Sequence, residues 1–185
     1  GYYGDCGDEV LTEDHGPGNS FLSRVCIEWE SVVKKHSEDL GLRHVSLRTG
    51  IVLDQQSGAL PSLAKSVKLG LGSAIGTGQQ WVPWIHLKDI VGMYLHGLEN
   101  KTLNGAYNAC APEQQTNEHL TKELAKKFKK PHFLPNIPAP LLRVILGQMS
   151  ELLLISNRMS SYRIEAAGYN FRFSTLESAL ENIYG

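Results

Sequence analysis

A strand, a glycine-rich loop and a capped helix follow one another between residues 48 and 89, and this order leaves few folds open. The segment reads RTGIVLD, then a loop that ends in GTGQQ, then WVPWIHLKDI. Its strand belongs to the longer run HVSLRTGIVLD, whose apolar residues do not alternate strictly, so both faces are expected to be buried. Strands of that kind occur in parallel sheets with helical crossovers. The pattern therefore predicts an α/β fold with a pocket lined by this segment.

A long amphipathic helix is predicted before this strand. Asn19 or Ser20 supplies its N-cap, FLSRVCIEWESVVKKHSEDL forms its body, and Gly41 closes it in the left-handed conformation. Its apolar residues recur at spacings of three and four and predict one buried face: Leu22, Val25, Cys26, Trp29, Val32 and Val33. Later helices are expected in LPSLAKSVKLG, LKDIVGMYLHGLEN and TNEHLTKELAKKF, and a buried strand in GAYNACAP. Pro83 predicts edge or irregular pairing for QQWVPWIH, and the last third reads as a helical annex.

The composition fits one compact globular unit, with 185 residues of which 42% are hydrophobic and 20% charged. A formal net charge of -1 argues against nucleic acid and anionic lipid as partners. No window approaches the roughly 18 apolar residues of a membrane span. Cys6, Cys26 and Cys110 form neither a CxxC pair nor an even set, so reduced thiols and a cytoplasmic location are expected, and no metal site is predicted.

The opening GYYG reads as the end of a strand that runs into a loop. A strand end needs a ladder partner, so this pattern predicts a fragment whose sheet begins earlier in the sequence. The strands RTGIVL and GAYNACAP would then expose an apolar edge. We expect the preceding segment, or a second copy in a homodimer, to cover that edge.

Three motifs allow both a structural and a functional interpretation. The glycines at 70, 72, 76 and 78 do not match GxGxxG, so a plain loop is favoured over a phosphate cradle. His86 and Asp89 could belong to a catalytic relay, but a strand-end histidine and a helix-start acid are favoured. Trp81 and Trp84 either line a ligand pocket or pack in the core. GxSxG and HExxH motifs are absent, which removes the main support for serine hydrolases and zinc proteases.

Several of these motifs occur in an order that resembles the extended short-chain dehydrogenase/reductases. The order is GYYG, a helix ending in EWE, RTGIVL, GLGSAIGTGQQWVPWIHLKDI, GAYNACAP and AAGYNF. The chain is most similar to their atypical epimerase-like branch, which includes sugar-nucleotide epimerases and proteins named as cell-division inhibitors. The resemblance extends over essentially all 185 residues.

This resemblance implies the C-terminal part of a Rossmann-type NAD(P)-binding fold with a small, mostly helical substrate-binding lobe. The Rossmann part would occupy about residues 1–60 and 85–112, interleaved with a lobe at about 60–85 and 112–185. The N-terminal dinucleotide-binding half, with its glycine fingerprint, would precede Gly1. The implied cofactor is NADP(H), and the implied partner is a small organic or nucleotide-sugar substrate.

The resemblance also assigns roles to individual residues. Tyr3 would lie near the nicotinamide or the substrate and is the candidate catalytic residue. The cofactor would further contact the end of the buried strand, where a glycine allows close approach of the backbone: Thr49, Gly50, Ile51 and Val52. The substrate would be contacted by residues of the segment after the glycine loop: Gln79, Gln80, Trp81, Trp84 and His86.

One departure from the family pattern bears on mechanism. Active members carry a tyrosine, followed four residues later by a lysine that lowers its pKa. Here Phe21 and Val25 occupy those positions, or Leu22 and Cys26 in the next register. Tyr2 or Tyr3 could substitute, but the sequence reveals no cation to activate them. Two hypotheses follow: an atypical NADP(H)-dependent epimerase or oxidoreductase, and a catalytically inactive NADP(H)-binding regulatory or sensor protein.

Overall fold

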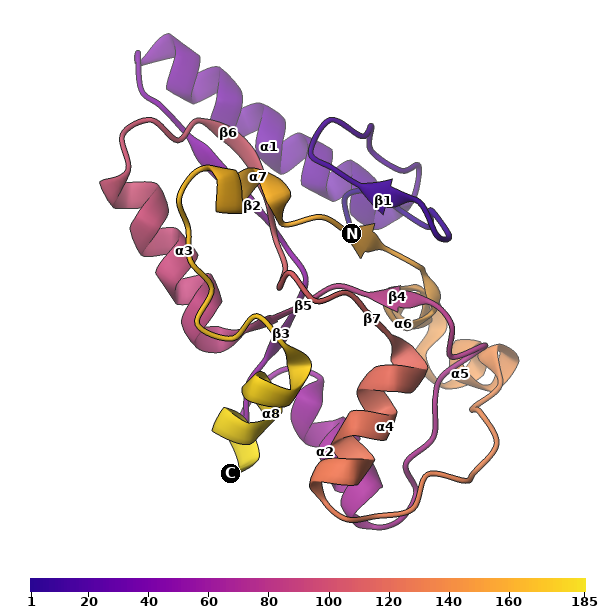
Figure 1. The fold of residues 1–185 in the computed structure, drawn as a ribbon. Helices are drawn as coiled ribbons and strands as arrows, with labels where there is room; N and C mark the ends of the chain where they lie inside the picture. Colours follow the sequence, from indigo (N-terminus) through magenta and orange to yellow (C-terminus); the bar gives the residue numbers. More distant parts are fainter.

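The computed structural model describes the whole chain except the side chains of residues 145, 146, 148 and 149. Its centre is a set of short parallel strand pairs flanked by helices (Figure 1). β2 (Val45–Thr49) pairs in parallel with β6 (Gly105–Ala109), and β3 (Ile51–Leu53) pairs in parallel with β5 (Trp84–His86). The α/β prediction is therefore confirmed.

The strand predicted over HVSLRTGIVLD changes partner at Gly50, between β2 and β3. The Gly50 N–H donates to the Ala109 carbonyl at 3.0 Å, and the next N–H, of Ile51, donates to the Pro83 carbonyl at 2.7 Å. A Cβ atom at Gly50 would lie 2.6 Å from that Pro83 oxygen. Gly50 thus lets two backbones meet where the pairing changes.

Gly50→Ala is expected to lower the free energy of unfolding by about 2 to 3 kcal/mol, because the new methyl group overlaps backbone that cannot rotate away. Gly58→Ala is the matched control: a Cβ there meets only the Val52 carbonyl, at 3.4 Å, although the φ of +76° adds some strain. Urea unfolding measures both variants. Equal losses in the two variants would contradict the close-approach argument.

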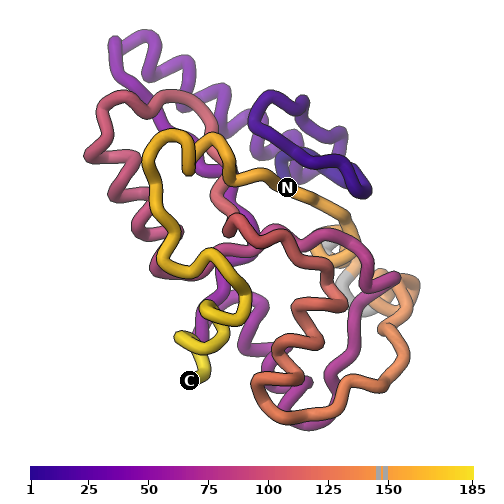
Figure 2. The backbone as a smooth tube through the Cα atoms, viewed as in Figure 1, coloured from indigo at the N-terminus to yellow at the C-terminus, as the bar shows by residue number. Residues whose placement is uncertain are grey.

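Pro83 divides the segment after the glycine loop into two strands with different partners. β4 (Trp81–Val82) pairs antiparallel with β7 (Gln115–Thr116), whereas β5 continues beside β3. The irregular pairing predicted from Pro83 is confirmed, since proline has no N–H to donate to a ladder. A further pair joins distant parts of the chain: β1 (Val10–Leu11) is parallel to β8 (Arg158–Met159). Figure 2 shows the orange stretch that contains β8 passing beside the indigo start of the chain.

Helices α2 (Leu60–Lys68), α4 (Asn117–Lys127) and α8 (Leu176–Tyr184) pack together at one end of the molecule (Figure 1). Their core contains Leu60, Leu124 and Leu180 together with Trp84 of β5. A second core lies under α3 (Leu87–Glu99) and α7 (Tyr162–Ala166) and includes Ile85, Met93 and Ile164. The remaining helical elements of the predicted annex are α5 (Ala139–Leu146), the 3-10 helix η1 (Gly147–Ser150) and α6 (Glu151–Leu154). In the part of the chain described, no helix is long and apolar enough to cross a membrane.

Helix α1 (Phe21–Asp39) has the predicted ends but not the predicted buried face. Ser20 caps it by accepting the Ser23 N–H, and Gly41 follows it with φ of +63°. Within the helix, Ser23 is the residue that is fully buried, whereas Trp29 and Val32 are 70% and 52% exposed. The predicted apolar face is therefore half-buried in its first part, at Leu22, Val25 and Cys26, and exposed in its second part, at Trp29, Val32 and Val33.

Candidate functional site

A cavity of about 210 Å³ lies where the N-terminal loop, the start of α1 and helix α6 meet. We call it the α1 pocket. It is lined by Gly1, Gly4, Asp5, Asn19, Ser20, Leu22, Glu151 and Ile155. Its walls combine apolar carbon from Leu22 and Ile155 with amide, hydroxyl and carboxylate groups. Neither lysine, arginine nor histidine is among these lining residues.

The N-terminal wall of the α1 pocket is tied to the annex by hydrogen bonds. The Asp5 carboxylate accepts the Ser156 N–H at 3.1 Å, and the Ser156 hydroxyl donates to the Gly7 carbonyl at 2.6 Å. Gly4 turns the chain at φ of +77°, a conformation that disfavours other residues. These contacts hold the loop and the residues after α6 in one arrangement, so the pocket has fixed walls on both sides.

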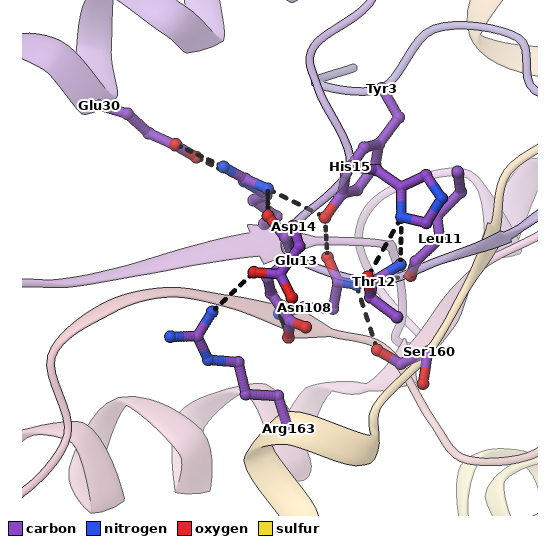
Figure 3. A network of polar contacts seen from close by, with 11 residues as sticks. Tyr3, Leu11, Thr12, Glu13, Asp14, His15, Glu30, Asn108, Ser160 and Arg163 are labelled. Atoms are coloured by element: carbon purple, nitrogen blue, oxygen red, sulfur yellow. Dashed lines mark hydrogen bonds and ion pairs between the residues drawn. The ribbon is translucent and has the colours of Figure 1, made fainter.

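Tyr3 lies directly behind this wall and is buried, with 4% of its surface exposed. Its hydroxyl donates to Asn108 Oδ1 at 2.6 Å (Figure 3). The same hydroxyl accepts from Arg48 Nη1 at 3.0 Å. Burial raises the pKa of Tyr3, and the adjacent guanidinium lowers it only in part. The hydroxyl therefore keeps its proton near neutral pH and has two protein partners already.

Arg48 is the cation that the sequence analysis did not find. Tyr3 and Arg48 are 45 positions apart, and β2 brings the guanidinium to the hydroxyl. Arg48 also forms a bidentate pair with Glu30 of α1, with both nitrogen–oxygen distances at 2.8 Å. Burial lowers the pKa of Arg48, but the hydrogen bonds that it donates to Glu30 and Tyr3 outweigh burial and hold that pKa above its ordinary value. A cation that the sequence did not reveal therefore contacts Tyr3, but the pKa of Tyr3 stays above its ordinary value because burial outweighs it.

The predicted cofactor strand lies apart from the lining of the α1 pocket. Thr49 is exposed and its hydroxyl donates to the Leu47 carbonyl at 3.2 Å. Ile51 and Val52 are half-buried and pack against the two hydrophobic cores. Gly50 was predicted to let a cofactor approach, and the structure gives it a different task, the contact with Pro83. That these four residues contact a nicotinamide stays a prediction.

Comparison with known proteins finds relatives that match most of the chain. The chain is 34% identical over 184 residues to the epimerase family protein YfhF of Bacillus subtilis, covering 99% of the chain and 60% of that protein. It is 34% identical over 163 residues to the epimerase family protein SAR0825 of Staphylococcus aureus strain MRSA252, covering 88% and 54% respectively. Residues 137–183 match a domain of unknown function, DUF1731.

A solved structure agrees with these relatives. The human epimerase family protein SDR39U1 (isoform 2) with NADPH superimposes with a TM-score of 0.90 at 29% identity, covering 99% of this chain and 62% of that one. These relatives and this structure support the resemblance to the epimerase-like family of atypical short-chain dehydrogenase/reductases. The nucleoside-diphosphate sugar epimerase of Corynebacterium glutamicum gives a TM-score of 0.80 at 29% identity, covering 100% of this chain and 35% of that one. The chain spans 54% of the length of SAR0825 and 60% of the length of YfhF.

In this epimerase-like chain Trp81 and Trp84 line the same small cavity, whereas Gln79, Gln80 and His86 are not among its lining residues. Gln79 is exposed and donates to Glu118 at 2.8 Å. Gln80 is buried, and its amide nitrogen donates to the Ile75 and Leu153 carbonyls. Trp84 is buried in the first core, where its Nε1 donates to the Glu113 carbonyl at 2.9 Å. The structure gives each of these three a partner within the protein, and their contact with substrate stays a prediction.

Trp81 occupies a more open position on the wall of a second, small cavity of about 10 Å³, room for one water molecule. Its Nε1 donates to Asp8 at 2.8 Å, and the Arg158 guanidinium lies 4.5 Å from the ring centroid. Arg158 Nε in turn donates to Gln114 at 2.6 Å. The sequence analysis missed Arg158 because nothing in its local pattern indicates an aromatic partner 77 positions away.

His86 and Asp89 have separate structural partners, as the favoured interpretation predicts. His86 caps α3 by accepting the Lys88 N–H at Nδ1, 3.0 Å away, and its ring packs 4.0 Å from that of Phe173. Asp89 is fully buried and accepts the N–H groups of Arg172 and Phe173 at 2.8 and 3.0 Å. The two side chains therefore do not form a relay in this structure. The glycine loop also turns the chain as a plain loop would, with positive φ at Gly70, Gly76 and Gly78.

Burial lowers the pKa of His86 below its ordinary value. The unfolded state then binds more protons between that lowered pKa and about 6.5, so this contribution to stability is lost as pH falls through the window. We expect the free energy of unfolding of the native protein to drop more between about pH 7.5 and 5.5 than that of His86→Asn, which keeps an N-cap side chain but does not titrate. Urea unfolding at both pH values measures the difference. An equal drop in the two proteins would contradict it.

Proposed function

We propose that this chain is the substrate-pocket part of an atypical NADP(H)-dependent epimerase or oxidoreductase acting on a small organic or nucleotide-sugar substrate. In this proposal about residues 1–60 and 85–112 complete a Rossmann-type domain, and about 60–85 and 112–185 form the substrate lobe. The observation that carries it is the similarity over 99% of the chain to a human epimerase family protein whose structure contains NADPH. The shorter span relative to the curated relatives supports the idea that the dinucleotide fingerprint lies in a preceding segment.

The α1 pocket offers a suitable place for the reactive end of such a cofactor. Leu22 and Ile155 supply apolar contact for a nicotinamide ring, and Asn19 and Ser20 carry amide and hydroxyl groups that suit its carboxamide. When bound, a nicotinamide cofactor supplies hydride transfer. The chain would contribute orientation of the ring and exclusion of water, because its loop is tied to the annex through Asp5 and Ser156.

Proton transfer is the step for which the chain offers least. At the positions where the family carries its tyrosine and lysine, this chain has Phe21 and Val25, or Leu22 and Cys26 in the next register. The Tyr3 hydroxyl already donates to Asn108 and accepts from Arg48. These observations favour the second candidate function, a catalytically inactive NADP(H)-binding regulatory or sensor protein. If turnover occurs, Asp5 and Glu151 are the ionisable groups on the pocket wall that could exchange a proton with substrate or water.

Cofactor titration and a turnover screen separate the two candidates. NADPH and NADH are titrated by quenching of tryptophan fluorescence, and nicotinamide absorbance is then followed with a panel of small carbonyl compounds and nucleotide sugars. Saturable NADPH binding with oxidation by any substrate supports the enzyme, and binding without oxidation supports the sensor. In the protein that includes the preceding segment, failure to bind either nucleotide would contradict both.

Tyr3→Phe tests the predicted catalytic residue separately. If Tyr3 carries a proton in the reaction, turnover is lost by about 100-fold or more while NADPH binding persists. If its role is structural, as its contacts with Asn108 and Arg48 suggest, stability falls by about 1 to 3 kcal/mol and the remaining folded protein keeps its turnover.

A further inference from the structure

We infer that Arg48 is the positioning residue of the α1 pocket, because one guanidinium fixes the two walls that meet there. This inference uses the proposed function only in treating the pocket as the ligand site. Arg48 itself does not line the pocket. It acts through Tyr2 and Tyr3, which lie between the lining residues Gly1 and Gly4, and through Glu30, which lies further along α1.

The N-terminal wall depends on Arg48 through two aromatic rings. Tyr2 and Tyr3 lie between the lining residues Gly1 and Gly4. The Arg48 guanidinium lies 3.4 Å from the Tyr2 ring centroid, and its Nη1 donates to the Tyr3 hydroxyl at 3.0 Å. Both side chains of this short wall therefore take their position from the same charged group.

The helix wall depends on Arg48 through Glu30. Glu30 lies on α1, the helix whose first turn supplies Ser20 and Leu22 to the pocket. Its two carboxylate oxygens accept from Nε and Nη2 of Arg48, which fixes direction as well as distance. Because α1 is a continuous helix, an anchor at Glu30 also fixes the position of its first turn.

The same group is held in place on its far side by the sheet. Arg48 belongs to β2, and its Nη1 also donates to the Glu13 carbonyl at 3.1 Å. Glu13 Oε1 accepts the Asn108 N–H at 2.7 Å, and the Asn108 side chain accepts from Tyr3 and donates to the Leu11 and Ser160 carbonyls (Figure 3). The Arg48 side chain is only 8% exposed, so water cannot readily replace these partners. Lysine could not replace the planar guanidinium here, because its single ammonium group cannot bind a carboxylate in bidentate fashion while also contacting a hydroxyl and an aromatic ring.

Hydrogen exchange of backbone amides tests this role without any ligand. The probes are the Gly18 N–H, which donates to the Tyr2 carbonyl, and the Ser23 N–H, which donates to the Ser20 hydroxyl. In Arg48→Lys we expect exchange at these two amides to become about tenfold faster, while amides of α4 change little. Glu30→Gln, a milder change of the same pair, is expected to accelerate the Ser23 amide in the same direction and remains informative if Arg48→Lys does not fold.

Leu124→Ala is the matched control, because it weakens the first core at a fully buried position of α4. It should accelerate α4 amides and leave the two wall amides nearly unchanged. Acceleration of α4 by Arg48→Lys as large as that at the pocket walls, or no acceleration at the walls, would overturn the inference. NADPH titration adds a functional readout, with about tenfold weaker binding expected for Glu30→Gln. If the native protein does not bind NADPH, the proposed function fails, whereas hydrogen exchange still decides the role of Arg48.

Discussion

Asp89→Ala is expected to lower the free energy of unfolding by about 3 to 5 kcal/mol, among the largest effects of any single change in this chain. The Asp89 carboxylate is fully buried at the start of α3 and accepts from three groups of the C-terminal segment: the Arg172 N–H, the Phe173 N–H and the Tyr169 hydroxyl. Removing it takes this acceptor from the Arg172 and Phe173 N–H groups, and each donor left unsatisfied costs about 1 to 3 kcal/mol, whereas the Tyr169 hydroxyl keeps the Asp89 carbonyl as an acceptor at 2.9 Å. Urea unfolding followed by circular dichroism measures the loss.

Asp89→Asn is the matched control for that prediction. Asparagine has nearly the same shape and keeps one acceptor oxygen, but its amide nitrogen would face an N–H donor. Its loss of stability should therefore be clearly smaller than that of Asp89→Ala. An Asp89→Ala variant within about 1 kcal/mol of the native protein would show that water replaces the carboxylate and that the buried network contributes little.

The sequence predicts elements better than it predicts the contacts between them. The ends of α1 follow from Ser20 and Gly41, and the break at Pro83 follows from the missing N–H, because each depends on one residue and its neighbours. The change of partner at Gly50 was missed, since an apolar run such as HVSLRTGIVLD does not show which strand each half pairs with.

The exposed side of α1 and the lining of the α1 pocket could not be predicted from the sequence for a second reason. Periodicity identifies an apolar face, but it does not supply the element that covers it, and Trp29 stays exposed in the described chain. Likewise, the pocket brings together residues near positions 1, 20 and 151, and Arg48 meets Tyr3 and Glu30 across 45 and 18 positions. Such contacts arise from tertiary packing, so local spacing carries no signal for them.

Trp84→Ala is expected to cost about 3 to 5 kcal/mol, because it removes the largest of the fully buried side chains from the core. Trp84 packs among Leu53, Leu124 and Leu180, and its indole N–H donates to the Glu113 carbonyl.

The resemblance predicts instead that Trp84 contacts substrate. The two roles differ in what Trp84→Phe should do: a core residue loses about 1 to 2 kcal/mol of stability and leaves ligand affinity unchanged, since phenylalanine fills most of the space. Parallel urea unfolding of Trp84→Phe and its titration with the panel of nucleotide sugars and small carbonyl compounds measure both quantities, with Trp81→Phe as the comparison at the half-exposed neighbouring site. A Trp84→Phe protein of native stability that binds ligand more weakly would assign Trp84 to the site and contradict its role in the core.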